Sequence, residues 1–382
     1  MCMFELRYNQ QQIIETINNK IIQKGEMERR FLMKKKIFAV IIATTMSLSM
    51  LACGGGGSAS SEKDKSASSS SEQSTAEVSS KTESANDEKS SSSVDVSELK
   101  IGIIMKSSDE FQNKVVEGAK DAAIEAGVKE ENFKAVASTS ESDSYQQVTA
   151  VEDMISNGTD ILLVSCQEEN ALKDSLQKAV DAGVALVMVD TDNSLVEGKV
   201  TFIGTDNYAA AYDGATEFAK SLDEGSNVVI LRGKLGDVNH ESRTSGLTDA
   251  LTEAGMNVLE VQDANCETDK AANVMEGFLS KYGNDGIDAV MVTSDSMAVG
   301  AAQAIKNQGI SGIKICGFDG FQAAISLIET GEIEMIIGQK PYSMGYDGVN
   351  DGIGYLKGET FKDYYDPGIQ MITTENYKEF IE

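Results

Sequence analysis

The sequence contains a single histidine, His240. Metal sites built from several histidines are therefore excluded, and a Ser-His-Asp triad would rest on this one residue. His240 could act as a base beside Glu241, but we predict a solvated histidine in a loop. The chain also lacks a phosphate loop with the spacing G-x-x-x-x-G-K-S/T. The sequence shows no nucleophile–base pair and no set of metal-ligating residues. It therefore predicts a protein that is not an enzyme and needs no cofactor.

Basic residues are scarce, with 33 Lys and Arg against 61 Asp and Glu, for a formal charge of −28. Nucleic-acid binding requires a basic face, so nucleic acid is excluded as a partner. The same charge fits poorly with direct binding to an anionic lipid surface.

Cysteine is also rare in the body of the chain, where Cys166, Cys266 and Cys316 occur. An odd number cannot form a complete set of disulfides, so we predict three unpaired, buried thiols. No histidine follows Cys266 at a position typical of a thiol nucleophile, which argues against thiol catalysis.

Residues 33–53 read MKKKIFAVIIATTMSLSMLAC and resemble a bacterial lipoprotein signal. Three lysines precede an apolar run that is too short for a comfortable membrane span. Cleavage before Cys53 would free its amine, and its thiol would carry the lipid. An uncleaved N-terminal anchor is the alternative. Either form places the rest of the chain outside the cytoplasmic membrane and tethered to it.

Three segments precede the folded body. Residues 1–32 have no secretory character, so we expect a mis-assigned start with Met33 as the initiator. Residues 33–52 are the expected signal peptide. Residues 53–96 carry the lipidated cysteine and a Ser-rich stretch with few apolar residues, which indicates a flexible linker.

From residue 97 onward, apolar strands alternate with amphipathic helices. Strands are predicted at 99–105, 161–164, 185–189, 228–231, 289–292 and 313–316. Helices are predicted at 109–126 and 169–182. Nearly continuous apolar strands separated by helices indicate an α/β fold with parallel sheets covered on both faces. The length favours two lobes.

Polar residues gather where these strands end, which is where open α/β sheets bind ligands. Asp190, Arg243, Asp319 and Gln339 offer carboxylate, guanidinium and amide groups that suit a neutral polyhydroxylated molecule. Phe111 could cover its apolar C–H face. Each polar residue also has a local alternative, namely a helix cap for Asp190, an Asp-Gly turn for Asp319, a surface ion pair for Arg243 and a strand-end position for Gln339. Four convergent groups favour a binding site.

From Leu99 to about Tyr377 the chain resembles the type I periplasmic sugar-binding proteins, especially the ribose-binding group. The resemblance rests on an ordered series of short motifs: Phe111 with Glu117-Gly118-Ala119, Val189-Asp190, Arg243-Thr244-Ser245-Gly246, Ser294-Asp295-Ser296-Met297-Ala298 with Gly300, Cys316-Gly317-Phe318-Asp319-Gly320 and Gln339-Lys340-Pro341. It implies two Rossmann-like lobes with parallel sheets, joined by a three-crossover hinge, that close on a sugar and deliver it to an ABC importer.

The resemblance also implies the limits of the lobes. The N-terminal lobe would comprise 97–205 plus 340–367, and the C-terminal lobe 206–339 plus 368–382. The two prolines of the chain, Pro341 and Pro367, fall beside the expected crossovers. They could limit hinge torsions, or Pro341 could simply begin a helix while Pro367 ends a loop.

Ten positions are implied as ligand contacts by the resemblance: Asp109, Phe111, Gln112, Asp190, Thr191, Arg243, Cys266, Ser294, Asp319 and Gln339. Thr191 stands where arginine is usual, Gln112 and Cys266 where phenylalanines stack on the ring, and Asp109 and Ser294 where asparagines are usual. A sugar-type ligand is therefore expected, whereas ribose itself does not follow.

Two alternatives share this fold. The body could be the effector domain of a LacI-type regulator, but such regulators carry an N-terminal helix-turn-helix and no secretion signal. It could instead be a ligand-sensing lipoprotein that passes its signal to a membrane sensor. The expected partners are thus a small sugar-like ligand, ABC permease subunits and the lipid on Cys53.

Overall fold

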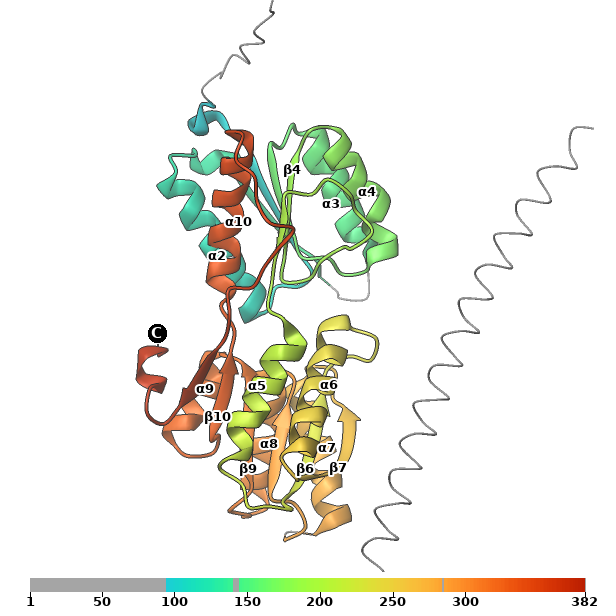
Figure 1. Cartoon of the computed structure of the whole chain (residues 1–382), viewed down its shortest axis with the longest axis vertical. Helices are drawn as coiled ribbons and strands as arrows, with labels where there is room; N and C mark the ends of the chain where they lie inside the picture. Colours follow the sequence, from blue (N-terminus) through green and yellow to red (C-terminus); the bar gives the residue numbers. More distant parts are fainter. Residues whose placement is uncertain (1–93, 140–143, 284, 382) are drawn as a thin grey trace, which may run out of the picture. The chain divides into compact units, whose positions relative to one another are not determined.

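A computed structural model describes residues 94–139, 144–283 and 285–381 (Figure 1). The expected signal peptide, Cys53 and most of the expected linker lie outside these ranges. Within the described ranges, no helix is both long enough and apolar enough to span a membrane.

The first of two six-stranded sheets has the order β11-β5-β4-β3-β1-β2, and all its strand pairs are parallel. Its strands are β1 (Ile101–Met105), β2 (Phe133–Ala137), β3 (Ile161–Val164), β4 (Ala185–Val189), β5 (Thr201–Ile203) and β11 (Tyr364–Tyr365). Alternate strand residues point to opposite faces. One face packs on α2 (Glu110–Glu125) and α10 (Pro341–Leu356), and the other on α3 (Ser144–Ser156) and α4 (Glu169–Asp181). We call this unit the first lobe.

The second sheet has the order β12-β10-β9-β8-β6-β7, with only the β10–β12 pair antiparallel. Its strands are β6 (Asn227–Arg232), β7 (Asn257–Asp263), β8 (Ala289–Val292), β9 (Lys314–Asp319), β10 (Met335–Gly338) and β12 (Gln370–Thr373). Helices α5 (Asn207–Ala219) and α6 (Val238–Glu253) cover one face. Helices α7 (Thr268–Tyr282), α8 (Asp295–Asn307) and α9 (Gln322–Glu329) cover the other. We call this unit the second lobe.

Three short segments connect the two sheets, namely residues 204–206, 339–340 and 366–369. The first leads from β5 to α5, the second from β10 to α10, and the third from β11 to β12. Two α/β lobes with mostly parallel sheets confirm the predicted fold class. The lobe limits given above stay a prediction.

Close helix packing fixes the helices that begin at the site. A Cβ added at Gly118 of α2 would lie 2.0 Å from the carbonyl oxygen of Tyr342 in α10. A Cβ at Gly246 of α6 would lie 2.4 Å from the carbonyl oxygen of Tyr208 in α5. Only glycine allows helix backbones to approach this closely. Both α2 and α6 are thus held rigidly, and their first turns carry site residues.

The apolar strands were predicted well. The predicted bounds of β3, β4 and β8 match the structure, and β1 begins at Ile101. Helix α2 begins one residue after the predicted start because Asp109 is its N-cap, accepting a hydrogen bond from the Gln112 amide at 2.9 Å.

Candidate ligand-binding site

Nine of the ten predicted contact residues line one cavity of about 320 Å³, to which both lobes contribute. Its lining comprises Lys106, Ser107, Asp109, Phe111, Gln112, Asp190, Lys234, Asp237, Asn239, His240, Arg243, Asn265, Cys266, Ser294, Ser296, Asp319, Phe321 and Gln339. Thr191 is the predicted residue that does not line it. The cavity lies at the carboxyl ends of the strands, as the parallel sheets require.

Backbone strain concentrates around this cavity. Among the described residues, four non-glycine residues have positive φ: Asp190 (61°), Asn265 (54°), Cys266 (61°) and Asp319 (123°). All four line the cavity. Such conformations cost free energy and tend to persist where function requires them. This distribution independently marks the cavity as a functional site.

Asp190 directly follows β4 and is almost fully buried. Its Oδ2 accepts from Lys106 Nζ at 3.1 Å, Gln112 Nε2 at 2.9 Å and Ser165 Oγ at 2.8 Å. Burial opposes ionisation, but Lys106 and these hydrogen bonds outweigh it and hold the pKa of Asp190 below its ordinary value. Asp190 is therefore an ionised acceptor in the site, and not the helix cap considered as an alternative.

Thr191 lies beside the cavity and serves its neighbours. Its hydroxyl contacts Lys106 Nζ at 3.0 Å and Asp190 Oδ2 at 3.1 Å, and accepts from Asn239 Nδ2 at 3.0 Å. The last contact joins the two lobes. Three protein partners leave this hydroxyl little capacity to hydrogen-bond a ligand. Thr191 therefore holds Lys106, Asp190 and Asn239 in place beside the cavity.

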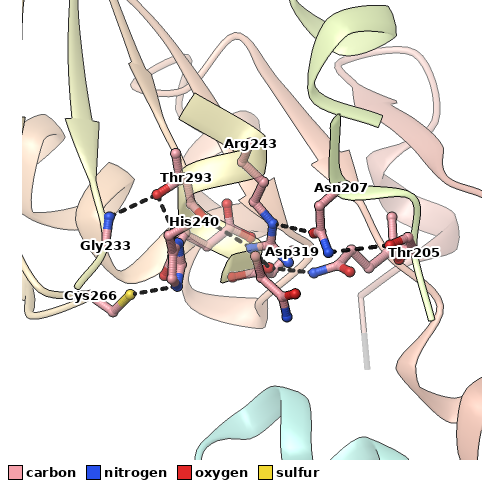
Figure 2. Close-up of polar contacts among 12 residues, drawn as sticks. Thr205, Asn207, Gly233, His240, Arg243, Cys266, Thr293 and Asp319 are labelled. Carbon is pink, nitrogen blue, oxygen red and sulfur yellow. Dashed lines mark hydrogen bonds and ion pairs between the residues drawn. The ribbon is translucent and has the colours of Figure 1, made fainter. Parts of the chain in front are cut away.

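Figure 2 shows Arg243, which lies on α6. Its side chain is buried, with 4 % exposed. Its Nε donates to Asn207 Oδ1 at 2.7 Å, and its Nη1 donates to the Thr293 carbonyl oxygen at 2.9 Å and to Asp319 Oδ1 at 3.0 Å. The guanidinium carbon lies 4.1 Å from the centre of the Phe318 ring. This pair is buried, unlike the surface ion pair considered as an alternative. Among the described residues, Nη2 has no hydrogen-bond partner, which leaves it available to a ligand.

Asp319 ends β9 and faces Arg243 (Figure 2). Its Oδ1 also accepts from Gln339 Nε2 at 2.7 Å, and Gln339 belongs to a segment between the sheets. Burial raises the pKa of Asp319 to about 6, although Arg243 and the Gln339 hydrogen bond lower it. The carboxyl group is therefore charged at neutral pH and titrates just below it.

The N-terminus of α2 supplies three of the predicted residues. Asp109 makes hydrogen bonds to its neighbours in the sequence: its oxygens accept from the Gln112 amide at 2.9 Å and from Ser107 Oγ at 2.6 Å. Phe111 and Phe321 are the aromatic residues of the lining. Gln112 is 2 % exposed and contacts Asp190.

His240 corrects the prediction of a solvated loop residue, because it lies in α6 and is partly buried. Its Nδ1 is 2.9 Å from Thr293 Oγ1, and its Nε2 is 3.2 Å from Cys266 Sγ (Figure 2). Burial and the charge of Arg243 lower the pKa of His240 to about 3, so the ring is neutral.

The cysteine prediction needs a related correction. Cys166 and Cys316 are buried, as predicted, whereas Cys266 is only partly buried because it lies at the cavity. Its histidine neighbour precedes it in the sequence, so a search for a histidine after Cys266 missed the contact.

A family model, the periplasmic binding protein domain, matches residues 101–360. The chain belongs to this family. The D-ribose/D-allose-binding protein of Pseudomonas aeruginosa is 30% identical over 270 residues, which cover 68% of this chain and 83% of that protein. The D-allose-binding periplasmic protein of Escherichia coli is 30% identical over 251 residues, covering 63% and 79%.

Solved structures agree. A periplasmic solute-binding protein of an ABC transporter from Actinobacillus succinogenes, with bound D-allose, superposes with a TM-score of 0.66 at 26% identity, covering 74% of this chain and 99% of that one. The predicted resemblance to type I periplasmic sugar-binding proteins is thereby confirmed.

Several lining residues of this periplasmic binding protein were not predicted as contacts: Lys106, Ser107, Lys234, Asp237, Asn239, His240, Asn265, Ser296 and Phe321. Lys106 and Ser107 stand in the polar turn after the first predicted strand, so the strand-end rule could have predicted them as contacts. The first turn of α6 and the segment before α7 carry no local signal, because only tertiary packing brings them to the cavity. Within the described residues, no group of three or more His, Cys, Asp or Glu side chains is placed to hold a metal.

Proposed function

We propose that this periplasmic binding protein is an extracytoplasmic lipoprotein that captures a sugar or related polyhydroxylated molecule in the cavity and delivers it to an ABC importer. The observation that carries the proposal is the pairing of the buried carboxylates of the cavity with basic side chains. Asp190 is paired with Lys106 at 3.1 Å, and Asp319 with Arg243 at 3.0 Å.

Paired charges favour a neutral ligand. An anionic ligand would meet the carboxylates, and a cationic ligand would meet Lys106 and Arg243. A hydroxyl both donates and accepts, so a polyhydroxylated molecule can use the remaining capacity of both carboxylates and of the guanidinium. Phe111 and Phe321 can cover an apolar C–H face of such a molecule.

The names of the relatives support this class of ligand. They bind D-ribose, D-allose, fructose and xylitol according to their names. The nine predicted residues that line the cavity are the contacts we propose. Gln112 and Cys266 replace the stacking aromatics of the ribose pattern, so the proposal is a sugar-type ligand and ribose itself does not follow.

Delivery to a permease is part of the proposal, and it is supported by two relatives that are named ribose import binding proteins. The lipoprotein signal at residues 33–53 supports anchoring through Cys53, with the Ser-rich stretch as the tether. The lobes at 97–205 plus 340–367 and 206–339 plus 368–382 are proposed to close over the ligand.

A thermal-shift screen followed by calorimetry tests the proposal. The probes are D-ribose, D-allose, D-arabinose, D-fructose, xylitol and myo-inositol, with gluconate, glutamate and spermidine as charged comparisons. A ligand at one hundred times its Kd stabilises the native state by about 2.7 kcal/mol, which raises the melting temperature. A response to charged probes alone, or to none of the neutral polyols, would overturn the proposal.

A further inference from the structure

Gln112 has one hydrogen-bonding atom that the protein leaves unused. The side chain is 2 % exposed and lines the cavity. Its Nε2 donates to Asp190 Oδ2 at 2.9 Å, whereas its Oε1 is buried without a hydrogen-bond partner in the described part of the chain. Buried acceptors are nearly always satisfied, so this oxygen requires an explanation.

The orientation of the amide is fixed by chemistry. Asp190 is ionised and can only accept, so the NH₂ group of Gln112 must face it. A flipped amide would place an oxygen against a carboxylate. Asp190 is itself held by Lys106 and Ser165, so the Gln112 oxygen cannot exchange places with the nitrogen.

A second unused acceptor lies next to it. Asp190 Oδ2 has several donors, but among the described residues Oδ1 is approached only by Asn239 Nδ2, at 3.5 Å. The side chains of Gln112 and Asp190 therefore present two oxygen acceptors with no strong donor of their own. A ligand that fills the cavity must bring donors to this end.

We propose that Gln112 determines ligand specificity by accepting a hydrogen bond from one ligand hydroxyl. The ligand is then a neutral monosaccharide or polyol that carries a hydroxyl at this position, and analogues that are deoxygenated there are rejected. This inference rests on the proposed function, because it assumes that the cavity takes a polyhydroxylated molecule. Phe111 and Phe321 supply the aromatic contact elsewhere in the lining.

Rejection follows from the cost of an unmet acceptor. A deoxy analogue would expel water from the cavity and leave the Gln112 oxygen without a donor. Sites built to bind a hydroxyl discriminate strongly against analogues that lack it, whereas apolar contacts discriminate weakly. A stacking phenylalanine at this position would not read the hydroxyl at all.

The test compares the wild-type protein with Gln112→Met by calorimetry. Methionine keeps a similar volume and removes both polar atoms, and Asp190 retains Lys106, Ser165 and Thr191 as partners. The probes are D-ribose, D-allose and myo-inositol, each with its series of monodeoxy derivatives. We expect the wild type to bind one deoxy derivative about 10- to 100-fold more weakly than its parent, and Gln112→Met to lower that ratio to about 3-fold or less while the ratios at other positions persist.

Two controls keep the outcome decisive. Gln308→Met makes the same chemical change at an exposed position after α8 and should leave every ratio unchanged. Gln112→Asn keeps the amide on a shorter side chain, so its oxygen no longer reaches the ligand. It should lower the same affinity ratio between parent and deoxy derivative, and it provides the test if Gln112→Met fails to fold. If a parent compound binds but both Gln112 variants keep every wild-type ratio, the inference is wrong and the proposed function stands. If no parent compound binds the wild type, the proposed function itself fails.

Discussion

Asn239 Nδ2 of α6 donates to Thr191 Oγ1, beyond the end of β4, at 3.0 Å and thus joins the two lobes directly. A second contact of this kind runs from the Gln322 amide of α9 to Glu110 Oε1 of α2, at 2.8 Å. The lobes are therefore fastened to each other by the protein's own groups. Both contacts stabilise the arrangement of the lobes in this structure, and the proposed ligand would add to them.

Glu110→Ala removes the acceptor of the second contact without touching the lining of the cavity. We expect the ligand-free protein to open, with a larger radius of gyration in small-angle scattering. Ligand affinity should fall about 3- to 10-fold, because only the closed fraction binds fully. Glu117→Ala, on the exposed side of the same helix, is the control and should change neither quantity. Equal scattering profiles for Glu110→Ala and wild type would contradict the role of this contact.

The sequence predicted most of the strands that consist of continuous apolar residues, although the buried strand β10 was missed. Strands β3, β4 and β8 were placed correctly because each is buried on both faces. The edge strand β7 was missed, since its sequence NVLEVQD mixes polar and apolar residues and its burial is partial. Edge strands are only partly buried, so their sequences lack the continuous run of apolar residues from which a buried strand is predicted.

The candidate site was predicted only where it coincides with strand ends. Asp190 and Asp319 stand directly at such ends, so their meeting in one cavity follows from parallel topology. Asn239 and His240 come from the first turn of a helix, and no local pattern shows which helix turns face the cavity. Thr191 was predicted as a contact from the family pattern, but Lys106 and Asn239 occupy its hydroxyl.

Arg243→Ala and Asp319→Ala should each weaken ligand binding by a factor of about ten to several hundred, since each 1.4 kcal/mol is tenfold. Either change leaves a buried charge without its partner, in addition to the lost ligand contact. Cys266→Ala should cost less, because a thiol is a weak hydrogen-bonding group. Calorimetry with the ligand from the screen measures these effects.

Arg232→Ala serves as the control for Arg243→Ala. Arg232 also forms ion pairs, but it is more exposed and does not line the cavity. It should bind ligand like the wild type. Wild-type affinity in both Arg243→Ala and Asp319→Ala would show that the ligand lies elsewhere.

Ligand affinity should fall as the pH decreases from 7 to 5, because Asp319 has a pKa of about 6. Protonation removes its charge and weakens its hydrogen bonds to Arg243, Gln339 and the ligand. His240 does not contribute, since its pKa of about 3 keeps it neutral over this range. Asp319→Asn should bind weakly at every pH and lose this dependence in calorimetry.

The contribution of Asp319 to folding stability should increase as the pH decreases from 7 to 5, whereas ligand affinity falls. The folded-state pKa of Asp319 is raised above its ordinary value, so the folded protein binds the proton more tightly than the unfolded chain. The contribution of Asp319 to the free energy of unfolding therefore increases as the pH falls through about 6. Asp190 has a lowered pKa, and its contribution is lost only as the pH falls below the ordinary range of aspartate. A loss of affinity at pH 5 accompanied by unfolding would contradict this account.

Cys53→Ala should abolish lipid attachment and release the protein from the membrane fraction. A single cysteine at the end of a short apolar run supplies the thiol for the lipid, and alanine has no replacement group. Mass spectrometry of the mature N-terminus and fractionation of cells measure the two effects. Cys166→Ala, a change at a buried cysteine in the first lobe, should leave the protein in the membrane fraction. An intact bond between residues 52 and 53, with no lipid attached, would contradict the prediction that the mature protein begins at a lipidated Cys53.

Asp295→Asn should be tolerated, whereas Asp295→Ala should not. Asp295 is fully buried, and its Oδ2 accepts from the amides of Gly320 and Phe321 at 2.7 and 2.8 Å. Burial and the nearby charge of Asp319 raise the pKa of Asp295 well above its ordinary value, and we propose that its carboxyl group is neutral in the folded protein. Asparagine reproduces a neutral side chain with the same accepting oxygen.

Urea unfolding separates the two variants. Asp295→Asn should cost about 1 kcal/mol of the free energy of unfolding. Both hydrogen bonds from the amides to Oδ2 persist, but the new NH₂ group lies at Oδ1, which has no hydrogen-bond partner among the described residues. Asp295→Ala leaves two partly buried amides without an acceptor and should cost about 2–3 kcal/mol. It should also weaken ligand binding, since these amides position Asp319 and Phe321 at the cavity. Asp269→Ala, at an exposed position of α7, is the control and should stay near zero. If asparagine destabilises the protein as much as alanine does, Asp295 is charged in the folded state, and the proposed neutral carboxyl group is wrong.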